Sequence, residues 1–120
     1  MWNLMLALHK LSVKEENRRL MLDYPTDIVI MLDTILKSKF EMVSLVQRYA
    51  LLACWNLCFE SDGAQRVRAS SLISTVQALK ASTTALKTLE AAKGVLFTLG
   101  QLVLNEDVRS SLLAVKCYVF

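Results

Sequence analysis

The chain has 120 residues, enough for one domain with an ordinary hydrophobic core, and 54% of them are hydrophobic. Its 14 basic and 11 acidic residues leave a mild net charge of +3 and are mixed along the chain, which argues against a nucleic-acid-binding surface. The longest stretch without a charged residue, 94–105, is shorter than the ~20 residues of a membrane-spanning helix. The apolar start, 1–8, lacks the basic segment and the cleavage site of a signal peptide.

Three cysteines are an odd number in a chain without a secretory signal. This predicts reduced, mostly buried thiols in a reducing compartment, the cytoplasm or the nucleus. Cys54 and Cys58 lie one helical turn apart, so they share one face of a helix. Neither a second cysteine pair nor a histidine has the spacing of a metal site, so we expect buried thiols and no bound metal.

The apolar residues follow helical spacing, and the 3 glycines and 1 proline are few, which predicts an all-α fold. A short helix should end before Pro25, because proline pushes Tyr24 away from helical geometry. The next helix is predicted from Asp27 to about Lys39. It carries one apolar stripe, formed by Ile28, Met31, Leu32, Ile35 and Leu36.

Charged residues of both signs precede this proline. Glu15 and Glu16 are expected in a polar connection, exposed to solvent and not catalytic. The basic residues near them predict a solvated, mixed surface: Lys10, Lys14, Arg18 and Arg19.

A longer helix is predicted from about 41 to 59. It has one apolar face at first and is apolar nearly all round from Tyr49 onward, so it should enter the centre of the fold. Residues 61–63 should end this helix, and Asp62 with Gln65 has the pattern of a capping box. Short, medium and long helices are then expected at 64–69, 72–80 and 84–104.

One motif recurs along the chain. The segment 53–59 is echoed by 7–13 and by 95–101, at spacings of 46 and 42 residues. A period in the low forties is typical of two- and three-helix repeats that stack into a solenoid. Because a solenoid commonly presents a binding surface, this repeat period favours a binding function over an enzymatic one.

The helix order short, medium, long, with an Ala-x-x-Ala-Cys-Trp-Asn-Leu ending, resembles the armadillo repeat. The likeness is clearest in 50–57 and 92–99. It implies an α–α superhelix, an armadillo-like solenoid with about two full repeats and a partial repeat at each end. Another α-solenoid, such as a HEAT array, and a compact helical bundle are the alternatives. The implied units are 1–13 (partial), 14–59, 60–101 and 102–120 (partial).

The resemblance also implies a binding groove lined by the third helix of each repeat. In armadillo proteins an asparagine near the end of that helix holds the backbone of an extended peptide. Asn56 matches this position, while Lys10 and Thr98 replace it in the neighbouring repeats. Core or groove-edge packing is expected for Trp55 and Phe97. The candidate protein-binding residues are therefore Asn56, Trp55, Lys10 and Thr98, and for Asn56 an ordinary polar helix end is the alternative.

Catalytic residues are not grouped in the sequence. His9 is the single histidine, and no acidic residue is placed for a local triad with it. The three glycines are isolated, so a phosphate-binding loop is not predicted. Gly94 falls where armadillo repeats place a small residue for close packing of a short first helix. We expect no enzymatic activity of the chain itself and no cofactor.

The expected function is that of a scaffold segment that binds partner proteins or peptides through a solenoid surface. The alternative is the regulatory armadillo region of a larger signalling protein, for example one fused to a TIR-type NAD-consuming domain. A structural spacer is a third possibility. The apolar ends, 1–8 and 112–120, predict a piece of a longer array whose flanking repeats cover them.

Overall fold

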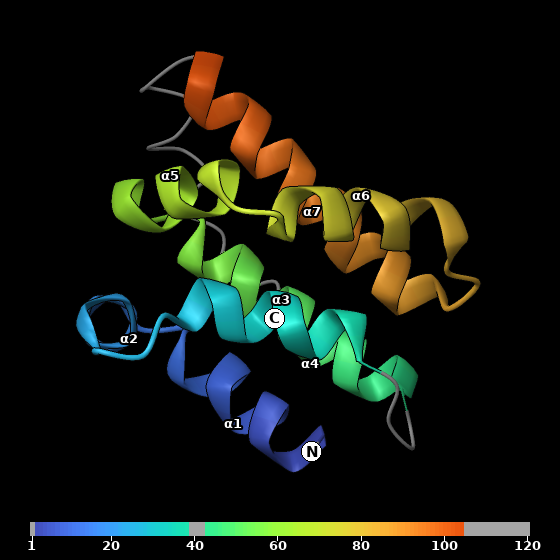
Figure 1. The fold of residues 1–120 in the computed structure, drawn as a ribbon, viewed down its shortest axis with the longest axis horizontal. Coiled ribbons are helices and arrows are strands. Elements are labelled where there is room, and N and C mark those ends of the chain that lie inside the picture. Colours follow the sequence, from blue (N-terminus) through green and yellow to red (C-terminus); the bar gives the residue numbers. More distant parts are fainter. Residues whose placement is uncertain (1, 39–42, 105–120) are drawn as a thin grey trace.

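The computed structural model describes residues 2–38 and 43–104, and every secondary-structure element in these two ranges is a helix (Figure 1). The prediction of an all-α fold is therefore confirmed for the described residues. The Cα radius of gyration, 13.0 Å, is that of a compact domain. The helices are α1 (Trp2–Leu11), α2 (Glu15–Asp23), α3 (Ile28–Lys37), α4 (Val43–Leu57), α5 (Ser61–Ala69), α6 (Leu72–Ser82) and α7 (Leu86–Leu104).

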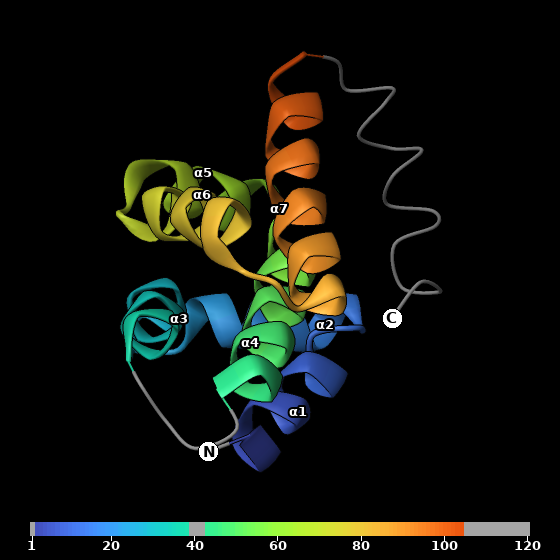
Figure 2. The same ribbon diagram turned by 90° about the vertical axis from the view of Figure 1, so that its right-hand side faces the viewer.

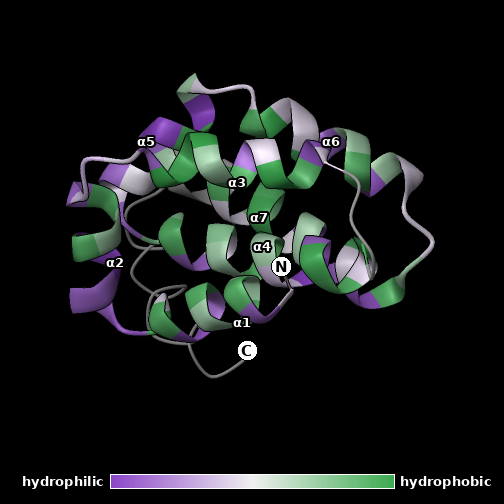
Figure 3. Cartoon of the chain, turned by 60° about the horizontal axis from the view of Figure 1, so that its bottom comes forward, coloured by the Kyte–Doolittle hydropathy of each residue, from purple (hydrophilic) through white to green (hydrophobic). Residues whose placement is uncertain are grey.

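The helices form two packed rows. In the first row α1 packs on α4, and α4 packs on α7; in the second row α3 packs on α6. The rows contact each other through α3 with α4 and through α6 with α7. Figure 2 shows α1, α4 and α7 following one another on one side of the molecule, with α3 and α6 on the other. The short helices α2 and α5 lie at the edge and carry many of the hydrophilic positions (Figure 3).

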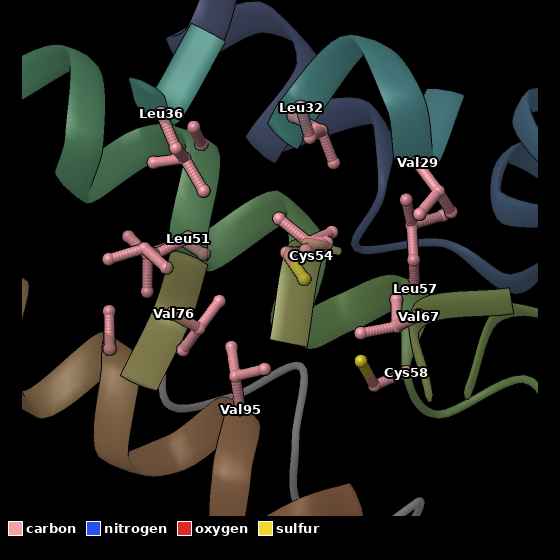
Figure 4. Close-up of a cluster of buried hydrophobic side chains, with 14 of the residues drawn as sticks. Val29, Leu32, Leu36, Leu51, Cys54, Leu57, Cys58, Val67, Val76 and Val95 are labelled. Atoms are coloured by element: carbon pink, nitrogen blue, oxygen red, sulfur yellow. The ribbon is translucent and has the colours of Figure 1, made fainter. Parts of the chain in front are cut away.

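The hydrophobic core fills the space between the two rows. Side chains from α3, α4, α6 and α7 meet there (Figure 4). Full burial of one valine, leucine or isoleucine side chain stabilises a fold by about 1.5–3 kcal/mol. The second half of α4 lies at the centre, as its all-round apolar sequence predicted. Its fully buried residues, each 0% exposed, are Ala50, Leu51, Ala53, Cys54, Asn56 and Leu57.

The break between α2 and α3 has the predicted cause. Tyr24, which precedes Pro25, ends α2 in an extended conformation, with φ −64° and ψ 143°. Asp27 then caps α3, because its Oδ1 accepts hydrogen bonds from the backbone N–H groups of Val29 (2.9 Å) and Ile30 (3.3 Å). The chain therefore turns between two helices over a few residues without leaving the first amides of α3 unsatisfied.

Arg66 of α5 joins the ends of α2 and α3. Its Nη2 donates to Oδ1 of Asp27 at 2.8 Å, and its Nη1 donates to the carbonyl oxygen of Leu22 at 2.7 Å. Burial opposes the charged form of Asp27, but the Ile30 amide and the Arg66 guanidinium outweigh it and lower the pKa of this carboxyl group. A positive group at the last carbonyls of α2 also complements the helix dipole.

Asp33 links α3 to the start of α6. Its Oδ1 accepts a hydrogen bond from Thr75 Oγ1 at 2.5 Å, and its Oδ2 accepts from Ser71 Oγ and from Lys37 Nζ (3.0 Å). Burial alone would raise the pKa of Asp33. The hydrogen bonds from Ser71, Thr75 and Lys37 have the larger, opposite effect, so the pKa of this carboxyl group lies below its ordinary value. The negative charge also faces the positive end of the α6 dipole.

The start of α5 differs from the prediction. This helix begins at Ser61, not at Ala64, so residues 61–63 form its first turn. The predicted capping box is wrong, because Glu60 is the capping residue and makes no side-chain capping bond. Gly63 explains the close turn: a Cβ atom there would lie 2.1 Å from the carbonyl oxygen of Leu57. Only glycine allows α5 to approach the end of α4 this closely.

The charged residues before Pro25 are also placed differently. Glu15 and Glu16 form the first turn of α2, where acidic residues favour the helix dipole, and not a connection. Arg18, expected in solvent, is only 3% exposed. Its Nε donates to Glu60 at 2.9 Å, and its Nη1 donates to the carbonyls of Ser12 (3.1 Å) and Val13 (2.7 Å). The guanidinium is buried because it satisfies these carbonyls at the end of α1.

Candidate protein-binding site

Asn56 lies inside the helix packing. Its side chain is 0% exposed, and its Nδ2 donates to Oγ of Ser12 at 3.1 Å, so it joins α4 to the end of α1. Ser12 Oγ in turn donates to the backbone carbonyl of His9 at 2.7 Å. Oδ1 of Asn56 is also buried, and it has no hydrogen-bond partner among the described residues. In this arrangement the side chain has no exposed surface with which to hold a peptide.

Trp55 joins α4 to α7. Its ring is partly buried, and its Nε1 donates to Oγ1 of Thr98 at 2.8 Å. Thr98 itself is 0% exposed. These two candidate residues therefore contact each other, and their hydrogen bond fixes the distance between two helices of the first row.

Gly94 makes room for this contact between α4 and α7. A Cβ atom at Gly94 would lie 2.3 Å from two carbon atoms of the Trp55 ring. The glycine thus provides the space in which the indole lies against α7. Phe97, in contrast, is 57% exposed, which excludes a core position for it.

Lys10, the fourth candidate, is exposed and lies at the rim of a pocket between α1, α4 and α7. The pocket has a volume of about 490 Å³ and is lined by residues from all three helices of the first row. Those of α1 and the following turn are Leu6, His9, Lys10 and Val13; those of α4 are Arg48, Tyr49 and Leu52; those of α7 are Lys87, Glu90 and Ala91. Lys10 is thus the one candidate that the structure places at this pocket.

Two aromatic rings and a guanidinium form one wall of this pocket. The rings of His9 and Tyr49 are stacked, with centroids 6.1 Å apart and planes at 20°. Cζ of Arg48 lies 5.3 Å from the centroid of Tyr49, a cation–π distance. His9 is 4% exposed, so its ring supports Tyr49 from within the core. The tyrosine and the guanidinium are therefore held in place by side chains of two helices.

The sequence gives a partial signal for the pocket residues that were not predicted. Lys10, Arg48 and Lys87 follow one another at spacings of 38 and 39 residues, slightly less than the motif period. Each lies next to apolar positions of a predicted helix. A search for basic residues 38–39 residues apart would have linked them, whereas a search at the motif period of 42–46 residues would not.

The thiols of Cys54, in α4, and of Cys58, directly after α4, lie in the core as predicted. Cys54 and Cys58 are both free, and each is 0% exposed. The neighbouring Cys54 and burial raise the pKa of the Cys58 thiol well above its ordinary value. Within residues 2–38 and 43–104, no group of three or more His, Cys, Asp or Glu side chains could hold a metal ion.

Comparison with family models, with curated proteins and with solved structures finds no match for this chain. The armadillo likeness therefore rests on the residues of the sequence alone. None of the described helices is long and apolar enough to cross a lipid bilayer.

Proposed function

We propose that the chain is a non-catalytic protein–protein interaction module that binds a partner protein through the face formed by α1, α4 and α7. The observation that carries this proposal is the pocket on that face, which is lined by all three helices and is rimmed by exposed charged side chains. Ligand pockets combine apolar walls with a few polar groups that set orientation, and this pocket has both.

The module is proposed to be part of an armadillo-like α-solenoid. Support comes from the packing of α1 on α4, of α4 on α7 and of α3 on α6, since each of these pairs would join equivalent helices of neighbouring repeats. Hydrogen bonds that join successive units also span nearly one period: Trp55–Thr98 spans 43 residues, Asn56–Ser12 spans 44, and Asp33–Thr75 spans 42. Contacts between nearest neighbours at a constant sequence separation are typical of repeat proteins.

The four candidate residues take different roles in this proposal. Lys10 is exposed and available for partner contact. Asn56, Trp55 and Thr98 hold the three helices of the binding face at fixed distances through their hydrogen bonds. The family's peptide-holding asparagine is therefore proposed to be a structural residue in this chain.

Peptide selection combined with crosslinking tests the proposal. The intact chain is used to select binders from a display library of random peptides, which makes no assumption about their charge. A photoreactive benzoylphenylalanine then replaces either Lys87, at the pocket, or Lys80, which is exposed on α6. Selected peptides should crosslink at position 87 and not at position 80. No enrichment of any peptide, or crosslinking at position 80 alone, would contradict the proposal.

A further inference from the structure

The pocket between α1, α4 and α7 has an excess of positive charge. Each of the three helices contributes one cation: Lys10 from α1, Arg48 from α4 and Lys87 from α7. Among the described residues that line it, Glu90 is the single acidic one. Since the three cations come from three helices, their grouping is a product of the fold.

Four other basic side chains of the described residues have acidic partners. Arg18 pairs with Glu60, Arg19 with Glu15, Lys37 with Asp33, and Arg66 with both Asp27 and Asp62. Lys10, Arg48 and Lys87 have no such ion pair with any described residue. Three of the seven described basic side chains that lack such a pair therefore line this one pocket.

The pocket is also suited to strengthen an ionic contact. The apolar side chains of Leu6, Leu52 and Ala91 form part of its lining, and low-dielectric walls focus the field of charges at the rim. The guanidinium of Arg48 is held at 5.3 Å over the Tyr49 ring, so less side-chain freedom is lost when it pairs with an anion.

We infer that this pocket receives an acidic side chain of an extended peptide segment, an inference that rests on the proposed function. The carboxylate of the peptide pairs with Arg48 and with one or both of the lysines. Glu90 accepts a hydrogen bond from a backbone N–H group of the same peptide. The partner is therefore recognised as a protein segment rich in Asp or Glu.

The charge pattern favours a peptide over a nucleic acid. The carboxylate of Glu90 repels a phosphate backbone, whereas it suits the N–H groups of a peptide. Single-stranded nucleic acids bind on exposed aromatic faces, and the ring of Tyr49 already packs against His9 and Arg48. A net charge of +3 over the whole chain is also small for a nucleic-acid-binding domain.

Charge reversal at the exposed lysines tests the inference. The binding of a fluorescent Glu-rich peptide to the full chain is followed by anisotropy, beside a peptide in which Gln replaces every Glu. Lys10→Glu and Lys87→Glu should each weaken binding of the Glu-rich peptide by about tenfold, because attraction becomes repulsion. Lys80→Glu and Lys93→Glu make the same change in net charge at exposed sites outside the pocket lining, and each should weaken binding by less than about twofold. Circular dichroism establishes that every variant is folded.

Several outcomes would overturn the inference. The Glu-rich peptide could fail to bind, or it could bind no more tightly than the Gln-rich peptide. Charge reversal at the pocket lysines could have the same effect as reversal at the control lysines. A single-stranded oligonucleotide could bind more tightly than the Glu-rich peptide. The random-peptide library distinguishes failure of the acidic-ligand inference from failure of the proposed function. Selected peptides that crosslink at position 87 but are neutral or basic would retain the binding face and refute its acidic ligand.

Discussion

At the scale of single residues, the contact of Trp55 with Gly94 and Thr98 has the clearest energetic consequence. The indole combines a partly buried ring with one hydrogen bond of 2.8 Å, and it reaches α7 only because position 94 has no side chain. A helical glycine normally costs about 1 kcal/mol relative to alanine. Here the chain accepts this cost in exchange for packing between two helices.

Gly94→Ala should destabilise the protein. The new Cβ would lie 2.3 Å from the Trp55 ring, so the ring must move and lose its bond to Thr98. We expect a net loss of about 1–3 kcal/mol in the free energy of unfolding, measured by urea denaturation. Gly100→Ala is the matched control, because a Cβ there meets no atom of another described element within 4 Å, and it should stabilise by up to about 1 kcal/mol. Equal effects of the two substitutions would show that the ring moves without cost.

Trp55→Ala should cost about 3 kcal/mol, the lower end of the range for truncation of a large aromatic residue, because the ring is only partly buried. The two sites touch, so their effects should not add: Gly94→Ala made in the Trp55→Ala protein should be neutral or stabilising. Denaturation of the two single variants and the double variant gives the coupling energy. A loss below about 1 kcal/mol for Trp55→Ala would contradict a structural role for the ring.

At the scale of elements, aspartates fix how the helices follow one another. Asp27 caps α3 and pairs with Arg66 of α5, while Asp33 accepts hydrogen bonds from Ser71 and Thr75 at the start of α6. Both carboxyl groups have a lowered pKa in the folded chain. Each therefore connects two helices most strongly while it is ionised.

Acid should weaken the fold through these two groups. A lowered pKa means that the carboxylate stabilises the folded state above the unfolded-state value of about 3.9, and that this stabilisation is lost as the pH falls through the folded-state pKa. Asp33→Asn should cost about 1–3 kcal/mol at neutral pH and should reduce the loss of stability below about pH 4. Urea denaturation at both pH values measures this, with the exposed Asp23→Asn as control. An unchanged acid dependence in Asp33→Asn would exclude this carboxylate as a cause.

The elements also show how far the sequence predicts the fold. Helical spacing and Pro25 predict the bounds of most described helices to within a few residues, because these signals are local in the sequence. The start of α5 was missed because Gly63 normally indicates a break, and its contact with Leu57 depends on tertiary packing. Arg18 could not be recognised as buried, because Glu60 lies 42 residues further along the chain. At the site, Lys10 was predicted on family likeness, whereas the convergence of Arg48 and Lys87 on it depends on how three helices pack.

At the scale of the whole molecule, an apolar groove lies at the edge formed by α1, α2 and α3. It has a volume of about 440 Å³ and is lined by Leu8, Leu20, Met21, Tyr24, Thr26, Ile28 and Met31. Leu20 is 69% exposed and Tyr24 is 67% exposed. The expectation of an apolar surface near the start of the chain holds for Leu4, which is 50% exposed, but not for Met5, which is fully buried. Residues 112–120, expected to be exposed as well, lie outside the described residues.

This groove should make the isolated chain self-associate at high concentration, because contiguous exposed apolar surface favours association. Leu20→Glu should reduce the average mass measured by light scattering. Leu86→Glu is the matched control, since Leu86 is 68% exposed and lies outside the groove, and it should have a smaller effect. A chain that stays monomeric at all concentrations tested would show that the groove does not drive association.

The position of α4 between α1 and α7 has a consequence for the dynamics of the chain. The backbone amides in the second half of α4 cannot reach solvent while both neighbouring helices remain packed on it. Their hydrogen exchange should therefore require global unfolding, whereas amides of α2, at the edge, should exchange through local opening. Exchange measured residue by residue should give α4 the highest opening free energy, and this helix would be the last part of the binding face to lose its structure.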